Sequence, residues 1–230
     1  MRVRVYPWLG HEWVEISGES KPGLPGDEAG RELLDRFDGA LHDFDLSLAN
    51  VVRTRLWGRD REARDLGSKA RVEVLASKAR SASSSYVAAS HFDSNGTVAI
   101  DLWAMRPSQS SAEKFIQEYE PAIVPLRYLV YDGVVVLSGV THEVGDLGAQ
   151  LDNILPRIAG SLKDAGSSWR QVARMSCHLH RSQPIPELRR LLSERLGPDF
   201  PSEVADYEFA DGYSSLGKLI EIEITASQGT

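Results

Sequence analysis

The sequence predicts a mixed α/β (α+β) protein built from two tandem domains with the same order of elements. Landmarks of the first half return in the second half with almost the same spacing. The pairs, which lie 121, 120 and 122 residues apart, are Ser17 and Ser138, Val52 and Val172, and Asp101 and Glu223. Chance similarity would not keep this register across loops. The 230 residues, 42% of them hydrophobic, also provide enough apolar material for two cores.

The sequence of the first half predicts strands and helices in the order β-β-α-β-α-β-β. Alternating polar and apolar residues predict strands over 2–8, 13–17, 50–57, 81–88 and 97–105. From Asp27, apolar residues recur at helical spacing as far as Leu48, and Asp27 favours a helix N-terminus. A second helix is predicted over 61–76, although Gly67 lies in its middle. A mixed sheet with both helices on one face follows from this order.

The second half repeats this order. A hairpin over 127–137 turns at Asp132-Gly133, a pair suited to positive φ. The spacing then predicts a helix over 147–163, a strand over 172–179, a helix over 186–195 and a closing strand over 219–226. We expect a short connecting helix over 112–119. The predicted boundaries are a domain over 1–107, a linker over 108–119 and a domain over 120–230.

Composition argues against several classes of protein. The net charge of -7 and the pI near 5.4 argue against nucleic acid as a partner. The basic residues Arg53, Arg55, Arg59 and Arg61 are interleaved with acids and are interpreted as a solvated strand end. The only cysteine, Cys177, leaves no intramolecular disulfide and is expected in the core. No apolar run reaches the length of a membrane span, so we expect a cytoplasmic protein without a membrane partner.

Several short passages resemble the Rid (YjgF/UK114) family of enamine/imine deaminases over residues 1–107 and 120–227. They are Ser-Gly at 17–18 and 138–139, Asn-Val-Val-Arg-Thr at 50–54, Lys-Ala-Arg-Ser at 78–81, Leu-Asp-Asn-Ile at 151–154 and Ile-Glu-Ile-Glu at 220–223. The resemblance implies chorismate-mutase-like domains that assemble in threes, with sites between neighbouring domains. We therefore expect a homo-oligomer, with a trimer favoured. A more distant resemblance is to the chorismatases, which hydrolyse an enol ether from a carboxylated ring.

The resemblance also implies roles for individual residues. Arg80 would anchor a substrate carboxylate through its two parallel donors, and Asp101 would assist the attacking water. The other predicted substrate-binding residues are Ser17, Tyr6, Trp8, Ser81 and Glu223. No cofactor and no metal is expected, and the ligand is predicted to be a small carboxylated metabolite.

Some positions depart from the family pattern. Glu203 stands near the place of the arginine in the second copy, so that half is expected to be degenerate or supporting. Asp101 is one methylene shorter than the usual glutamate, and Ala82 replaces a cysteine that many of the deaminases carry. The loop over 88–96 is longer than usual. These departures favour a specialised substrate, larger than a small amino-acid imine.

Other chemistries find less support in the sequence. His178 and His180 share one face of a strand, as metal ligands can, but no third ligand is evident, and solvent-facing or interface histidines are the favoured interpretation. The serine run at 81–85 has no evident His-Asp partners. The leading hypothesis is a cofactor-free hydrolase or deaminase acting on a carboxylated imine, enamine or enol-type metabolite. The alternatives are a chorismatase-like hydrolase and a noncatalytic metabolite-binding protein.

Overall fold

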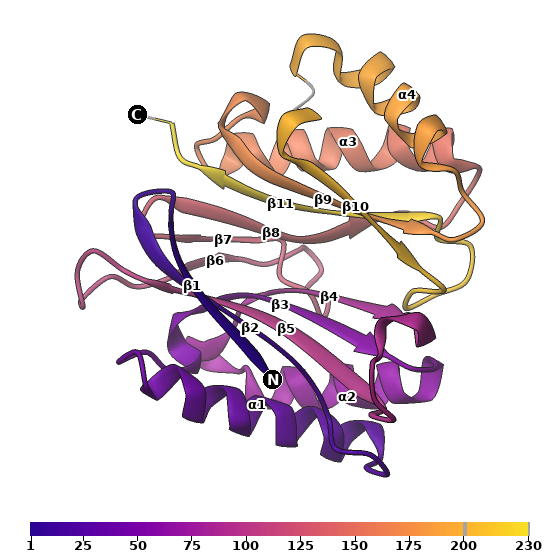
Figure 1. The fold of residues 1–230 in the computed structure, drawn as a ribbon. Helices are drawn as coiled ribbons and strands as arrows, with labels where there is room; N and C mark the ends of the chain where they lie inside the picture. Colours follow the sequence, from indigo (N-terminus) through magenta and orange to yellow (C-terminus); the bar gives the residue numbers. More distant parts are fainter. Residues whose placement is uncertain (200–201, 230) are drawn as a thin grey trace.

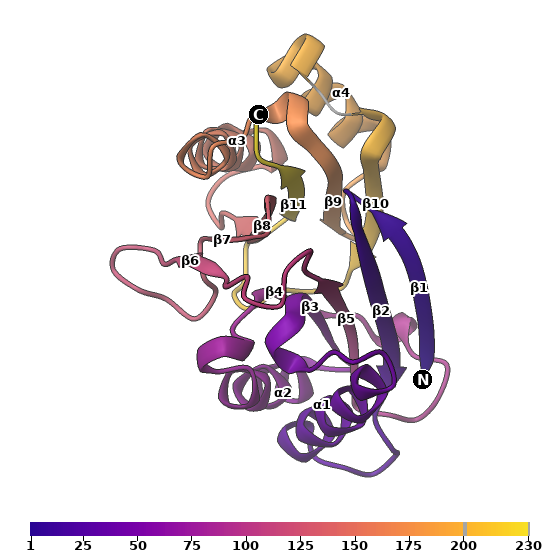
Figure 2. The same cartoon turned by 90° about the vertical axis from the view of Figure 1, so that its left-hand side faces the viewer.

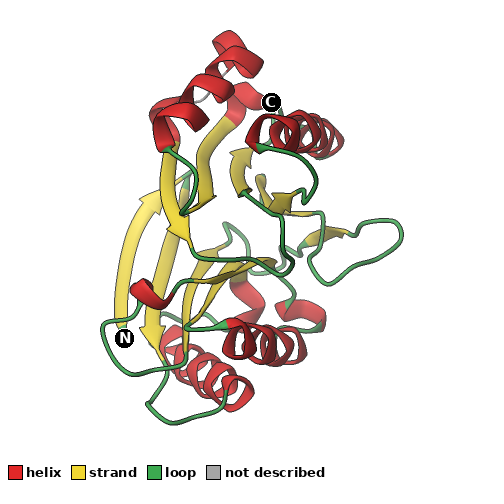
Figure 3. Cartoon of the chain, turned by 90° about the vertical axis from the view of Figure 1, so that its right-hand side faces the viewer, coloured by secondary structure: helices red, strands yellow, loops and turns green. Residues whose placement is uncertain are grey.

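The computed structural model describes residues 1–199 and 202–229, which form two mixed sheets that face each other. Helices cover the outer face of each sheet, so the layers run helix, sheet, sheet, helix (Figure 1). Figure 2 and Figure 3 show the same layering from the two sides, with the strands between the helices. The predicted fold class is confirmed. No helix in the described part is long and apolar enough to cross a membrane.

The first sheet has the strand order β1-β2-β5-β3-β4, in which only β3 and β4 run parallel. The elements of this half are β1 (Arg2–Trp8), β2 (His11–Glu19), α1 (Gly26–His42), β3 (Val51–Gly58), α2 (Arg61–Val74), β4 (Ala82–Val87) and β5 (Val98–Arg106). Asp60 caps α2 by accepting a hydrogen bond from the backbone N–H of Ala63 at 2.8 Å.

Gly67 in the middle of α2 has a packing role. A Cβ atom on Gly30 of α1 would lie 3.2 Å from the carbonyl oxygen of Gly67, and one on Gly67 would lie 3.0 Å from Val98. The two helices therefore approach each other and the sheet more closely than side chains would permit. This contact offsets the weak helix propensity of glycine.

The second sheet has the order β10-β9-β11-β8-β7-β6, in which β9 and β10 run parallel. Its elements are β6 (Phe115–Gln117), β7 (Tyr128–Tyr131), β8 (Val134–Thr141), α3 (Leu147–Asp164), β9 (Val172–His180), α4 (Ile185–Leu196), β10 (Ala205–Ala210) and β11 (Ile220–Ser227). The predicted helix over 112–119 is wrong, because β6 forms there and pairs with β7. Pairing at the sheet edge outweighs the weak local helix signal.

The space between the sheets is apolar at both ends and polar in the middle. One apolar cluster includes Trp13 and Trp103, and another includes Trp57 and Tyr213. Along β5, Asp101 lies between Ala99 of the second cluster and Trp103 of the first. We call the region between the two clusters the polar band; it contains Arg55, Asp101 and Glu223.

Candidate active site

Strand β11 places two carboxylates on the same side. Ile220, Ile222 and Ile224 point into the core beneath α3 and α4 and are fully buried. Because side chains alternate along a strand, Glu221 and Glu223 both face the first sheet. Both glutamates are also buried, at 6% and 2% exposure. Their surroundings differ, and this difference defines the site.

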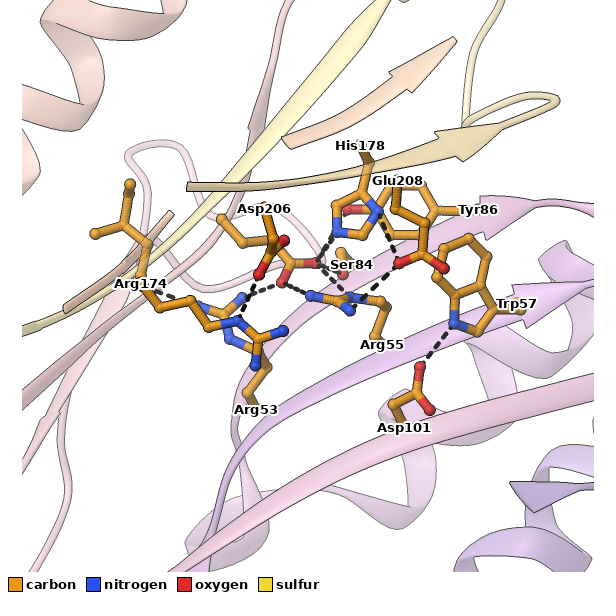
Figure 4. A network of polar contacts seen from close by, with 12 residues as sticks. Arg53, Arg55, Trp57, Ser84, Tyr86, Asp101, Arg174, His178, Asp206 and Glu208 are labelled. Carbon is orange, nitrogen blue, oxygen red and sulfur yellow. Dashed lines mark hydrogen bonds and ion pairs between the residues drawn. The ribbon is translucent and has the colours of Figure 1, made fainter. Parts of the chain in front are cut away.

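Glu223 is held as an anion by two arginines of β3. Its Oε2 lies 2.9 Å from Arg53 Nη1 and 2.8 Å from Arg55 Nη2, and its Oε1 accepts from Arg55 Nε at 3.2 Å. The hydroxyls of Tyr86, at 3.0 Å, and Ser84 also donate to Oε1 (Figure 4 labels these partners). Burial alone would raise the pKa of Glu223, but Arg55 and Arg53 lower it well below its usual value.

The interpretation of Arg53 and Arg55 as a solvated strand end is wrong. Each is 5% exposed, because its face of β3 looks toward the second sheet. Arg53 also donates from Nη2 to the carbonyl oxygens of Leu137 and Ile224, both at 2.8 Å. The two arginines thus join the halves of the chain through a carboxylate that lies far away in the sequence.

Glu221 lies two residues before Glu223 on β11, but no arginine pair binds its carboxyl group among the described residues. Burial raises its pKa to about 7, against the opposing effect of Lys218, and the neighbouring charge of Glu223 adds to the rise. The side chain lies directly over Gly139 of β8, where an added Cβ would be 2.0 Å from Glu221 Oε1. Only glycine at 139 leaves room for this carboxyl group. Glu221 is therefore a protonatable group near neutral pH.

Glu221 lines a cleft of about 580 Å³ between α2 of the first half and the second half. The wall on the first half consists of one face of α2 and residues 83–85 of β4, and the opposite wall of the ends of β8 and β11 with the preceding loop. Four cations line the cleft: Arg64, Lys69, Arg71 and Lys218. A cleft of this size, with a few convergent polar groups, is typical of a small-molecule site.

The four cations differ in how many hydrogen bonds and ion pairs they already make with the protein, and Lys69 is the exposed one on α2. Arg71 is 3% exposed and donates to the Ser84 carbonyl oxygen at 2.6 Å and the Ser85 hydroxyl at 2.8 Å. Arg64 pairs with the half-exposed Asp65, and its Nε makes no hydrogen bond within the described residues. Lys218 contacts only a serine hydroxyl among its hydrogen-bond partners in this part of the chain, and burial lowers its pKa. Of these four cations, Arg64 and Lys218 also lower the pKa of Glu221, and they are the two best placed to hold a ligand carboxylate beside it.

Arg80, the predicted anchor, lies at the start of β4 in a narrow recess that shares Arg71 and Val124 with the cleft. Its fork donates to Glu118, from Nε at 2.7 Å and from Nη2 at 2.8 Å. The Nη2 group also donates to the Val124 carbonyl oxygen at 3.4 Å. The guanidinium thus holds the segment that leads into the second half. Its role as a carboxylate anchor stays a prediction.

Asp101, the predicted acid, accepts a hydrogen bond from Trp57 Nε1 at 2.9 Å (Figure 4). It lies opposite Ser17 on the neighbouring strand, so the structure brings these two predicted residues together. No hydrogen bond or ion pair within residues 1–199 and 202–229 joins Arg80 to Asp101. Their joint action on one substrate therefore also stays a prediction.

The other predicted residues lie in three places. Tyr6 and Trp8 of β1 pack against the apolar cluster around Trp13. Ser81 is buried in the recess with Arg80, and its hydroxyl has no partner among the described residues. Glu223 is the only one of the set at the centre of the polar band, and its oxygens bind protein groups.

The histidine and cysteine of β9 lie on opposite faces. Cys177 is fully buried in the helix-side core, as expected, and burial raises the pKa of its thiol. His178 is fully buried between the sheets and stacks on Tyr86 at 4.2 Å (Figure 4). Burial and Arg55 lower its pKa well below the usual value, so the ring is neutral. No cluster of three metal-ligating side chains is found in the described part of the chain.

Sequence reasoning did not single out Glu221, Arg71 or Arg64. One signal was available for Glu221, because it lies two residues before Glu223 on a strand and must share its face. The cations carried no comparable signal. Arg64 and Arg71 are ordinary positions of an amphipathic helix, and only the packing of the second half against that helix turns them into cleft residues.

Gly139→Ala provides a direct test of how Glu221 is held. The added Cβ would overlap the carboxylate oxygen and lie 2.6 Å from Glu221 Cδ, so the carboxyl group must move. We expect the pKa of Glu221, measured by ¹³C NMR of labelled carboxyl groups, to change by one unit or more. Gly39→Ala, where a Cβ meets no atom within 4 Å, is the control and should leave that pKa unchanged. An unchanged pKa in Gly139→Ala would contradict the tight contact.

Comparisons with known proteins agree with this architecture. No protein-family model matches the chain, and no curated protein sequence matches it. Among solved structures, a chorismatase aligns with a TM-score of 0.64 and 15% identity, over 98% of this chain and 80% of its own. A YjgF/YER057c/UK114 family member from Mycobacterium tuberculosis aligns at 24% identity and a TM-score of 0.43, over 50% of this chain and 99% of its own. A Rid-family protein from Yersinia pestis aligns at 17% identity and a TM-score of 0.44, over 50% of this chain and 98% of its own.

The chorismatase match, at 15% identity, shows similarity of fold alone. The chain is a two-domain protein with the fold of a chorismatase.

Proposed function

We propose that the protein is a hydrolase that binds a carboxylated metabolite in the cleft beside α2 and uses Glu221 as its acid and base. The observation that carries the proposal is a buried, protonatable carboxyl group in a cleft of about 580 Å³ that four cations line. Neighbouring carboxyl groups whose surroundings push their pKa values apart are a recurring feature of acid–base sites. Glu221 and Glu223 form such a pair.

The chemistry follows from these roles. Arg64 and Lys218 bind the substrate carboxylate and orient the reacting double bond toward Glu221. Protonated Glu221 donates its proton to the carbon of an enamine or enol ether, or to an imine nitrogen, and makes the adjacent carbon electrophilic. Water attacks that carbon, and the anionic Glu221 then accepts a proton from it. Collapse of the adduct releases ammonia or an alcohol. A pKa near 7 keeps both forms of Glu221 populated at neutral pH.

Two classes of substrate are candidates under this proposal. The Rid-family resemblance favours a carboxylated imine or enamine, with deamination as the reaction. The chorismatase fold favours an enol ether on a carboxylated ring. Both require a bound carboxylate and a proton donor. We also keep the homotrimer as a proposal, since edge strands β1 and β6 carry the exposed apolar side chains of Val3, Val5 and Phe115, which a second copy would bury.

The test is a turnover panel on the purified protein. Ammonia release from freshly generated 2-iminopropanoate and loss of chorismate are measured for the native chain and for Glu221→Gln, Asp101→Asn and Arg80→Ala. Loss of turnover in Glu221→Gln, with Asp101→Asn active, supports the cleft assignment. Loss of turnover in Asp101→Asn and Arg80→Ala, with Glu221→Gln active, supports Arg80 and Asp101 as the catalytic residues. Binding of these acids without turnover in the folded native protein would refute the hydrolase and leave a binding protein.

A further inference from the structure

The cleft has a charged end and an apolar end, and α2 connects them. At one end, Arg64 lines the cleft from α2, and Ser214 and Lys218 line it from the loop on the opposite wall. Arg64 and Lys218 both lower the pKa of Glu221, which places them near its carboxyl group. This end is therefore cationic around one protonatable acid.

The apolar side chains of the lining are Val72, Val124 and Pro125, which mark the other end, with Glu73 next to Val72 along α2. Val72 follows Arg71 on α2, and the adjoining recess contains both Val72 and Val124. Arg64 and Val72 are eight residues apart on one helix, which corresponds to about 12 Å along its axis. The distance from the cationic end to the apolar end therefore suits an elongated ligand better than a three-carbon acid.

Val124 is held at the cleft although much of it is exposed. Its side chain is 59% exposed, and it lies in the segment between β6 and β7. Arg80 donates to the Val124 carbonyl oxygen and pairs with Glu118, six residues earlier in the same segment. An apolar side chain that water contacts and that the backbone holds over a cleft is a feature that a ligand would bury favourably.

We propose that the cleft binds an amphipathic carboxylic acid, with its carboxylate between Arg64 and Lys218 and its apolar body against Val72, Val124 and Pro125. The inference rests on the proposed function for the location of the carboxylate, but it concerns binding and does not require turnover. The volume of about 580 Å³ lies within the usual range for ligands larger than a three-carbon acid.

The test is calorimetric titration of the whole chain with acetate, butanoate, hexanoate and octanoate. Each methylene that enters the apolar end should tighten binding roughly fourfold, until the chain spans the cleft. Octanamide, which lacks the charge, should bind at least tenfold more weakly than octanoate. Val124→Asp should weaken octanoate at least tenfold and leave acetate unchanged. Ile123→Asp, at the adjacent exposed residue that does not line the cleft, is the matched control.

The outcomes separate this inference from the proposed hydrolase. Equal affinities for acetate and octanoate, or equal effects of Val124→Asp and Ile123→Asp, would overturn the amphipathic ligand. Chain-length-dependent binding without turnover on the substrate panel would refute the hydrolase and leave this inference standing. Turnover of 2-iminopropanoate with no dependence of binding on chain length would overturn the amphipathic ligand and leave the hydrolase standing.

Discussion

Glu221→Gln is expected to lose turnover by roughly 10²- to 10⁴-fold and to be more stable than the native chain at pH 8. The first effect is the usual contribution of a positioned proton donor. The second arises because the folded state keeps this carboxyl group at a pKa of about 7, whereas the unfolded chain ionises it near 4.5. No ion pair within residues 1–199 and 202–229 holds Glu221, and the charges of Lys218 and Arg64 only partly offset its burial, so the ionised form destabilises the fold and the neutral amide removes that cost.

The sign of the pH dependence follows from proton binding. Between about pH 4.5 and 7 the folded state binds more protons at Glu221 than the unfolded state, so native stability falls as the pH rises. The shift corresponds to about 3 kcal/mol across that window, and Glu221→Gln should lack it.

Urea unfolding at pH 5, 6, 7 and 8 measures both effects on stability. Glu12→Gln is the matched control, because Glu12 is exposed and its ion pair among the described residues is with the exposed Arg106. Its stability should follow that of the native chain at every pH. A Glu221→Gln variant that is less stable than the native chain at pH 8 would show that the carboxyl group has a stabilising partner, and it would contradict the proposed role.

Glu223→Ala is expected to lower the free energy of unfolding by about 3–5 kcal/mol. The substitution leaves Arg53 and Arg55 buried without their carboxylate, and removing one partner of a buried ion pair has an effect of this size. It also removes the acceptor for Ser84 and Tyr86. Because these residues join the two sheets, the loss should appear in unfolding of the whole chain. Urea denaturation followed by tryptophan fluorescence measures it.

The control for Glu223 is Glu208→Ala. Glu208 has a side chain that is 38% exposed and lies 3.7 Å from Arg55, so its loss should cost less than about 1 kcal/mol. Because the pKa of Glu223 is lowered in the folded state, the stability that its ion pairs contribute depends on pH in the acid range. Its contribution is complete above about pH 4.5 and is lost as the pH falls toward the lower folded value. A Glu223→Ala variant as stable as Glu208→Ala would contradict the inference that the ion pairs of Glu223 with Arg53 and Arg55 hold the two sheets together.

Tertiary packing explains where the sequence analysis was wrong. The 112–119 segment has a weak helical pattern, yet Phe115–Gln117 pairs with β7, because an open sheet edge supplies partners for its backbone groups. Arg53 and Arg55 look like solvated residues beside other charged positions, yet each is 5% exposed. Their counter-charge, Glu223, lies 168 residues from Arg55, and no local pattern shows that the two meet.

The sequence by itself determined the duplication, the fold class and the face on which the acids of β11 lie. Each of these depends on local periodicity or on a repeated spacing, and both are present in the chain itself. Tertiary structure alone decided that Glu223 is an ion-paired anion while Glu221 is a protonatable acid beside Arg64 and Lys218. The physical reason is that pKa values depend on burial and on charges brought together from distant segments, here α2, β3 and the end of the chain.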